Sequence, residues 1–76
     1  MKQRQQIWLL ILQMYEENGK KNFTRKYFLN KFIKKLERKW PNQKTPSQTV
    51  SRIFQELRDD GKIEFLEKGV YRIKEN

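Results

Sequence analysis

The spacing of apolar residues predicts a chain that is helical for most of its length and extended near its end. Between residues 45 and 61, apolar side chains recur at intervals of three and four positions, at Val50, Ile53, Phe54 and Leu57. This interval places them on one face of a helix, because an α-helix completes a turn in about 3.6 residues. We therefore expect an amphipathic helix over residues 45–60 that buries this stripe.

The two ends of this predicted helix carry residues that favour helix termini. Thr45 is a favourable N-cap, and Pro46 suits the first helical position. Gln48 stands where a capping box places the side chain that reaches back toward the N-cap. Gly61 stands where a left-handed C-cap needs glycine.

The face opposite the apolar stripe is polar. At 100° per residue it carries Gln48, Arg52, Gln55 and Asp59, with Ser51 on its flank. Glutamine, arginine and serine are side chains that contact base edges or phosphates in DNA complexes. The helix therefore has the polarity expected of one that enters the major groove of DNA.

Two further helices are predicted upstream. The first spans residues 2–17. The second begins at Phe23-Thr24, with Thr24 as its N-cap, and ends before Trp40. Their apolar stripes predict the buried positions Ile7, Leu10, Ile11, Met14, Phe28, Leu29, Phe32, Ile33 and Leu36.

The first helix carries more apolar side chains than its core stripe needs. Trp8, Leu9, Leu12 and Tyr15 widen its apolar surface. The explanation we favour is that a small domain uses every large side chain it has, with Trp8 and Tyr15 half buried. The alternative is an interface formed by Trp8, Leu9 and Leu12, either with a second copy in a homodimer or with a partner domain.

Past residue 61 the helical repeat gives way to alternation. Residues 62–66 and 70–73 are rich in β-branched and aromatic side chains and predict two strands. Residues 67–69 predict the turn between them, because their glycine accepts a positive φ. The face expected to close over the helices carries Ile63, Phe65, Tyr71 and Ile73.

Three helices followed by a C-terminal β-hairpin is the order of elements in the winged helix-turn-helix fold. The predicted class is mainly α with a two-stranded wing, in one domain over residues 1–76. A two-stranded hairpin is marginally stable alone in water, so the wing must pack on the helices. In this fold the last helix enters the major groove, and the wing reaches the sugar-phosphate backbone or the adjacent minor groove.

The composition of the chain limits the kinds of partner it can bind and excludes several kinds of metal and catalytic site. Eighteen Lys and Arg residues against nine Asp and Glu give a formal net charge of +9, which favours a polyanionic partner. The absence of cysteine excludes disulfides and thiolate metal sites, and the absence of histidine excludes His-based metal ligation and Ser-His or Cys-His nucleophile pairs. Asp60-Gly61-Lys62 matches the D-x-K fragment of metal-dependent nucleases, but it falls at a helix end and turn. We therefore predict a non-enzymatic protein without catalytic residues, metal or cofactor.

Double-stranded DNA is the expected partner. The longest apolar run, residues 7–12, is too short to span a bilayer, and its flanks lack a signal peptide's cleavage pattern. We expect a soluble cytoplasmic protein, or a soluble domain of a larger one, without membrane association. RNA is a weaker alternative, because the narrow major groove of A-form RNA would exclude the helix. The other alternative is a protein-interaction winged helix whose charge serves only solubility.

The C-terminal half of the sequence resembles a known family. Residues 55–66 read QELRDDGKIEFL and are followed by Gly69-Val70-Tyr71-Arg72. This string is similar to the end of the C-terminal winged-helix domain of DpnI-type restriction endonucleases, which cut adenine-methylated DNA. The resemblance implies a duplex-DNA-binding accessory domain that adds recognition of a methylated GATC site to that of a separate nuclease domain. The first two helices agree only in pattern.

The candidate contact residues fall into two sets. We expect base reading by residues of the last helix, namely Ser47, Gln48, Thr49, Ser51, Arg52 and Gln55. We expect phosphate contacts from a row on the second helix, from the following loop and from the wing, namely Lys31, Lys34, Arg38, Lys44, Lys68 and Arg72. Any single lysine is also explained as a solvated surface residue, and the row as a whole indicates a phosphate-facing flank.

Some of these positions have competing structural roles. Arg52 can pair with Glu56 one turn further along the helix. Gln48 can complete the capping box instead of reading adenine. Outside the two sets, we assign Arg58 to packing and local pairing, and Tyr71 to the core.

Overall fold

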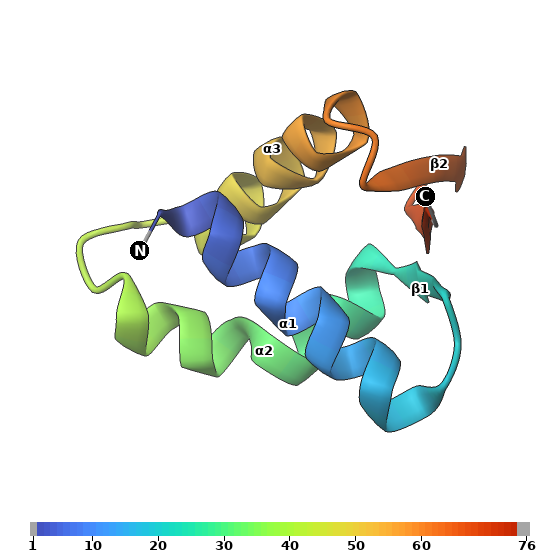
Figure 1. Ribbon diagram of the computed structural model, residues 1–76. Helices are drawn as coiled ribbons and strands as arrows, with labels where there is room; N and C mark the ends of the chain where they lie inside the picture. The colour runs from blue at the N-terminus through green and yellow to red at the C-terminus, as the bar shows by residue number, and fades with distance from the viewer. Residues whose placement is uncertain (1, 75–76) are drawn as a thin grey trace.

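The computed structural model describes residues 2–74 and packs a small antiparallel sheet against one end of three helices (Figure 1). The elements in chain order are α1 (Gln3–Asn18), β1 (Asn22–Thr24), α2 (Arg25–Lys39), α3 (Pro46–Asp59), β2 (Ile63–Glu67) and β3 (Val70–Ile73). This order confirms the predicted winged-helix class, and each predicted helix and strand lies close to its expected position. None of the helices within residues 2–74 has both the length and the apolar character that a membrane span requires.

The sheet has a third strand that the sequence did not predict. β1 pairs with one edge of β3 and β2 pairs with the other, so the strand order is β1-β3-β2. Phe23, expected to begin the second helix, lies instead in β1, buried opposite Tyr71. The predicted two-stranded wing is thus corrected to a three-stranded sheet. Three residues are too few to show an alternating pattern, and they form a strand only through pairing with distant β3.

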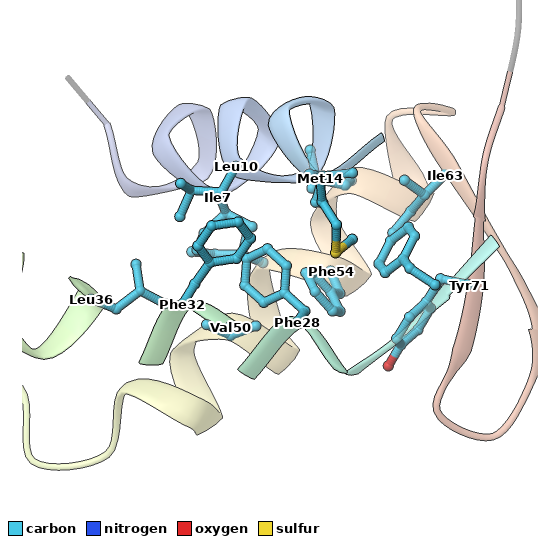
Figure 2. Close-up of a cluster of buried hydrophobic side chains, with 14 of the residues drawn as sticks. Ile7, Leu10, Met14, Phe28, Phe32, Leu36, Val50, Phe54, Ile63 and Tyr71 are labelled. Atoms are coloured by element: carbon cyan, nitrogen blue, oxygen red, sulfur yellow. The ribbon is translucent and has the colours of Figure 1, made fainter. Parts of the chain in front are cut away.

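The core contains an aromatic cluster that includes Phe54 on the inner face of α3 (Figure 2). The centroid of the Phe54 ring lies 5.7 Å from that of Phe23, 5.3 Å from that of Phe28 and 4.9 Å from that of Tyr71. All three pairs are edge-to-face, a favourable geometry for aromatic rings. One side chain of α3 therefore contacts β1, α2 and β3 together.

The predicted apolar stripes supply most of the remaining core. The buried residues of α1 and α3 include Ile7, Leu10, Ile11, Met14, Val50, Ile53 and Leu57, as expected. Helix α2 buries Phe28, Phe32 and Leu36 but leaves Leu29 and Ile33 half buried. The burial predicted for those two positions is therefore only partial, because they lie at the margin of the stripe.

The end of the wing is more exposed than the alternating pattern predicts. Ile63 is buried, but Phe65 on the same predicted face is 39% exposed. The pairing of β2 with β3 is irregular between Phe65 and Glu67, and β2 is an edge strand. The Phe65 ring contacts Tyr71 at a centroid distance of 4.7 Å and stays partly exposed to solvent.

Helix α3 ends as predicted. Gly61 has a φ of 79°, and its N–H donates to the carbonyl of Arg58 at 3.0 Å. The N–H of Lys62 donates to the carbonyl of Leu57 at 2.9 Å. These two bonds form a Schellman cap, which glycine permits because it has no Cβ to oppose a positive φ.

The start of α3 differs from the prediction, because the capping box at Thr45 is not formed. Thr45 Oγ1 donates to Gln48 Oε1 at 3.3 Å and accepts from no backbone N–H. Its ψ of 74° departs from the extended conformation of an N-cap. Thr24, in contrast, has a ψ of 153°, and its Oγ1 accepts from the Tyr27 N–H at 3.0 Å. Thr24 is thus confirmed as the side-chain cap of α2.

The two threonines should therefore differ in their effect on stability. We expect Thr24→Ala to lower the free energy of unfolding by about 1 kcal/mol, because it removes a side-chain cap. Thr45→Ala should lower it by less than about 0.5 kcal/mol, because the Thr45 hydroxyl caps no backbone N–H. Urea unfolding followed by circular dichroism measures both variants against the wild type. Equal losses in the two variants would contradict this assignment.

Candidate nucleic-acid interface

The outer face of α3 carries the polar side chains that the sequence placed there. Gln48, Arg52 and Gln55 are exposed, while the opposite face of the helix is buried in the core. The Gln55 side chain forms no hydrogen bond with any other residue in the range 2–74. The only hydrogen-bond partner of the Gln48 side chain within residues 2–74 is the exposed Thr45 hydroxyl. This face is therefore accessible to a partner.

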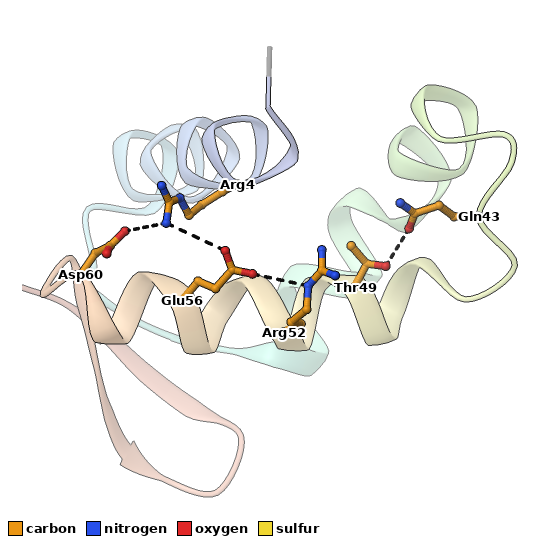
Figure 3. Close-up of polar contacts among 6 residues, drawn as sticks. All are labelled: Arg4, Gln43, Thr49, Arg52, Glu56 and Asp60. Atoms are coloured by element: carbon orange, nitrogen blue, oxygen red, sulfur yellow. Dashed lines mark hydrogen bonds and ion pairs between the residues drawn. The ribbon is translucent and has the colours of Figure 1, made fainter.

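Arg52 belongs to a chain of ion pairs that joins α3 to α1 (Figure 3). Its Nε lies 3.4 Å from Glu56 Oε2, as the spacing of the two residues predicted. Arg4 Nη1 of α1 lies 3.9 Å from Glu56 Oε1 and 3.0 Å from Asp60 Oδ2. Both carboxylates therefore have a cationic partner on α1, which offsets negative charge on the helix expected to approach DNA.

No pattern in the sequence predicted that Arg4 would pair with acids of α3. Arg4 is one of several polar residues at the start of a helix, and its partners are on a helix far along the chain. Only the packing of α1 beside α3 brings the three side chains together.

Two of the predicted base-reading residues already have partners within the protein. Thr49 Oγ1 donates to Gln43 Oε1 at 2.6 Å, which ties the α2–α3 loop to the start of α3. Ser51 Oγ accepts from Arg25 Nε at 2.5 Å and donates to the Ser47 carbonyl at 3.2 Å. Both serines and Thr49 are half buried on the flanks of α3. Their contacts with bases stay a prediction, and Gln48, Arg52 and Gln55 are the more accessible members of the set.

The basic row on α2 lies on the side of that helix next to the end of α1. Lys31 Nζ is 2.5 Å from Glu17 Oε2, and this hydrogen bond lowers the pKa of Glu17 and raises the pKa of Lys31. Lys34 and Arg38 are exposed. At 100° per residue, Lys34 falls on the face of α2 opposite Arg25, which contacts α3. The row is thus remote from the side of α2 that adjoins α3, and its phosphate role stays a prediction.

The remaining predicted phosphate contacts lie on the loop and the wing. Lys44 is exposed in the α2–α3 loop, and Lys68 is exposed in the turn between β2 and β3. Arg72 is exposed on the outer face of β3, where Glu64 of β2 is its neighbour across the strands.

Arg58 pairs locally and packs against another side chain, as predicted, and its packing partner lies in the wing. Its guanidinium lies 4.7 Å from the centroid of the Phe65 ring, and its Nη2 lies 3.3 Å from Asp59 Oδ1. The Phe65 ring in turn contacts the buried Tyr71. Burial raises the pKa of the Tyr71 hydroxyl, and the nearby positive charge of Arg25 opposes that rise.

The apolar surface of α1 agrees with the explanation we favoured. Trp8 and Tyr15 are half buried and pack against the core. Lys62 Nζ lies 5.4 Å from the centroid of the Trp8 ring. Leu12 is half buried, and Leu9 is 44% exposed.

The nuclease-like fragment Asp60-Gly61-Lys62 forms the end of α3 and the following turn, at the position the sequence predicted. The Asp60 carboxylate pairs with Arg4. Across residues 2–74 no three His, Cys, Asp or Glu side chains gather in an arrangement that could hold a metal ion.

Comparison with known proteins adds one finding. The sequence model of a protein family described as a Dam-replacing HTH (helix-turn-helix) domain matches residues 3–73. No curated protein and no solved structure matches the chain. The matched residues run from the start of α1 to the end of β3, so they also include the two helices that agreed only in pattern. The match confirms the resemblance to the DpnI-type C-terminal winged-helix domain.

Proposed function

Because the chain belongs to the family of Dam-replacing HTH domains, we propose that it binds double-stranded DNA with α3 in the major groove. The observation that carries this proposal is the accessible face of α3, where Gln48, Arg52 and Gln55 lie side by side on a chain of net charge +9. Arginine reads guanine, and glutamine reads adenine, through paired hydrogen bonds in that groove. The β2–β3 turn reaches the sugar-phosphate backbone beside it.

In this proposal the basic side chains have two roles, reading bases and positioning the protein on the DNA backbone. Arg52 contacts a base or a phosphate, and it can exchange Glu56 for this partner because an exposed pair contributes only about 0.2 to 1 kcal/mol. Arg4 then remains as the partner of Glu56. Lys44, Lys68 and Arg72 contact phosphates, and their contribution falls as salt rises.

The proposal extends to which DNA sequences the chain prefers. The DpnI-type resemblance leads us to propose that binding is sensitive to sequence or to adenine methylation. We further propose that the chain acts in the cytoplasm as an accessory domain of a restriction system and carries out no catalytic step. Fluorescence anisotropy on a GATC duplex, its adenine-methylated twin and a scrambled duplex tests the preference. Equal affinity for all three would remove the methylation claim while leaving DNA binding intact.

Salt dependence tests the DNA-binding proposal directly. If the chain neutralises about six phosphates, log K should fall with log salt with a slope near about −5. Arg52→Gln should reduce the preference among sequences, whereas Lys34→Gln should weaken binding to all sequences alike if the basic row contacts phosphate. Fluorescence anisotropy over a salt series measures both effects. A slope near zero for the wild type would rule out the proposal.

The ion pair between Arg52 and Glu56 leads to a second test of the same site. We expect Glu56→Gln to raise DNA affinity about two- to fivefold, because it frees Arg52 and removes a negative charge from α3. Glu37→Gln is the matched control, because it removes the same charge from an exposed position on α2. Equal gains in the two variants would show that only net charge matters.

The exposed Leu9 favours a second candidate function, a protein interface on α1 that includes Trp8 and Leu12. If this surface pairs with a second copy, light scattering after size-exclusion chromatography should show a dimer. Leu9→Lys should then restore the monomer, because it places a charge in an apolar contact. A wild-type monomer at high concentration would remove self-association.

A further inference from the structure

Arg25 lies where the start of α2 meets the first turns of α3 and the wing turn. It is the first residue of α2, and its backbone N–H donates to the carbonyl of Gly69 in the wing turn at 3.0 Å. Its side chain reaches α3, where Nε donates to Ser51 Oγ at 2.5 Å and Nη2 donates to the Ser47 carbonyl at 3.3 Å. One residue therefore contacts the wing and the first turns of α3 from the start of α2.

The charge of Arg25 has no counter-ion within the described part of the chain. Its side-chain partners are a hydroxyl and a carbonyl, both neutral, and none of the ion pairs among residues 2–74 includes it. The residue is half buried, so water compensates its charge less fully than at an exposed position. Among the other arginines of residues 2–74, Arg4, Arg52 and Arg58 each have a carboxylate within ion-pair distance, and the two that have none, Arg38 and Arg72, are exposed to water.

The donor geometry of Arg25 suits an oxyanion. A guanidinium carries more N–H donors than the two contacts with α3 use, and its planar fork matches phosphate oxygens. Because Ser51 and Ser47 already hold the side chain, little conformational freedom is left to lose on binding an anion. Lysine lacks this fork, so the arrangement favours arginine.

Resting on the proposed function, we infer that Arg25 binds a phosphate of the DNA backbone and thereby sets the position of α3 in the groove. The phosphate supplies the counter-ion that the protein does not. Ser51 acts as a positioning residue for the guanidinium instead of reading a base. The same contact also positions the wing, because the backbone N–H of Arg25 donates a hydrogen bond to the Gly69 carbonyl.

Three variants separate this role from a purely structural one. Arg25→Gln removes the charge and the fork. Ser51→Ala removes the side-chain support but keeps the charge. Lys39→Gln is the control, because it removes the same charge from an exposed position at the other end of α2. Circular dichroism and thermal unfolding first establish the folded fraction of each variant.

Fluorescence anisotropy with a duplex over a salt series then measures the affinity and the salt slope. We expect Arg25→Gln to bind about tenfold more weakly and to reduce the magnitude of the slope by about 0.9, the value for one phosphate. Ser51→Ala should keep the wild-type slope. Lys39→Gln should change both quantities much less than Arg25→Gln does. An unchanged slope in folded Arg25→Gln would overturn the inference, while leaving the proposed function intact if the wild type binds DNA.

A measurement on the wild type decides the case in which Arg25→Gln does not fold. The Nε–Hε resonance of Arg25 should move when duplex DNA is added. Inorganic phosphate at the same total phosphate concentration should leave it in place, because only the docked duplex presents its phosphate beside α3. No movement with DNA, or equal movement with inorganic phosphate, would overturn the inference.

Discussion

The edge-to-face contacts of Phe54 with Phe23, Phe28 and Tyr71 are the interaction on which the rest of the structure depends. They come from the inner face of α3 and reach two strands and a helix at once. A helix held by such contacts cannot rotate about its own axis without losing several of them. The side chains on its outer face therefore keep a defined direction, and the accessible face of α3 is a consequence of the core behind it.

The charged residues beside α3 also differ in role: some neutralise acids within the protein, and one is left without a counter-ion. The chain has a net charge of +9, and one of its cations, Arg4 of α1, pairs with the two acids at the end of α3. Without Arg4, those acids would repel a polyanion that approaches α3. Arg25 shows the opposite arrangement, a half-buried cation held by neutral groups. The neutralised acids lie on one flank of α3 and the uncompensated cation beside the opposite flank, and both favour an anionic partner.

The sequence predicted those features that depend on residues close together in the chain. The stripe from Val50 to Leu57 and the glycine cap at Gly61 were found because helix periodicity and a positive φ leave local signals. β1 was not found, because Asn22–Thr24 becomes a strand only by pairing with β3. Arg4 and Arg25 were missed for the same reason, since their partners lie on other elements. The cap at Thr45 was predicted wrongly, because it depends on a ψ angle that residue type alone does not determine.

The strand order β1-β3-β2 also affects how the fold is acquired. The central strand of the sheet is the last of the three along the chain, so neither neighbour has its partner until that segment is present. Tyr71, on this strand, also contributes to the aromatic cluster beneath α3. During synthesis the three helices can form and collapse together, but the cluster stays incomplete until the end of the domain has left the ribosome. The last of the contacts that orient α3 is therefore completed only with β3, and chains that lack this strand also lack the contact between Phe54 and Tyr71.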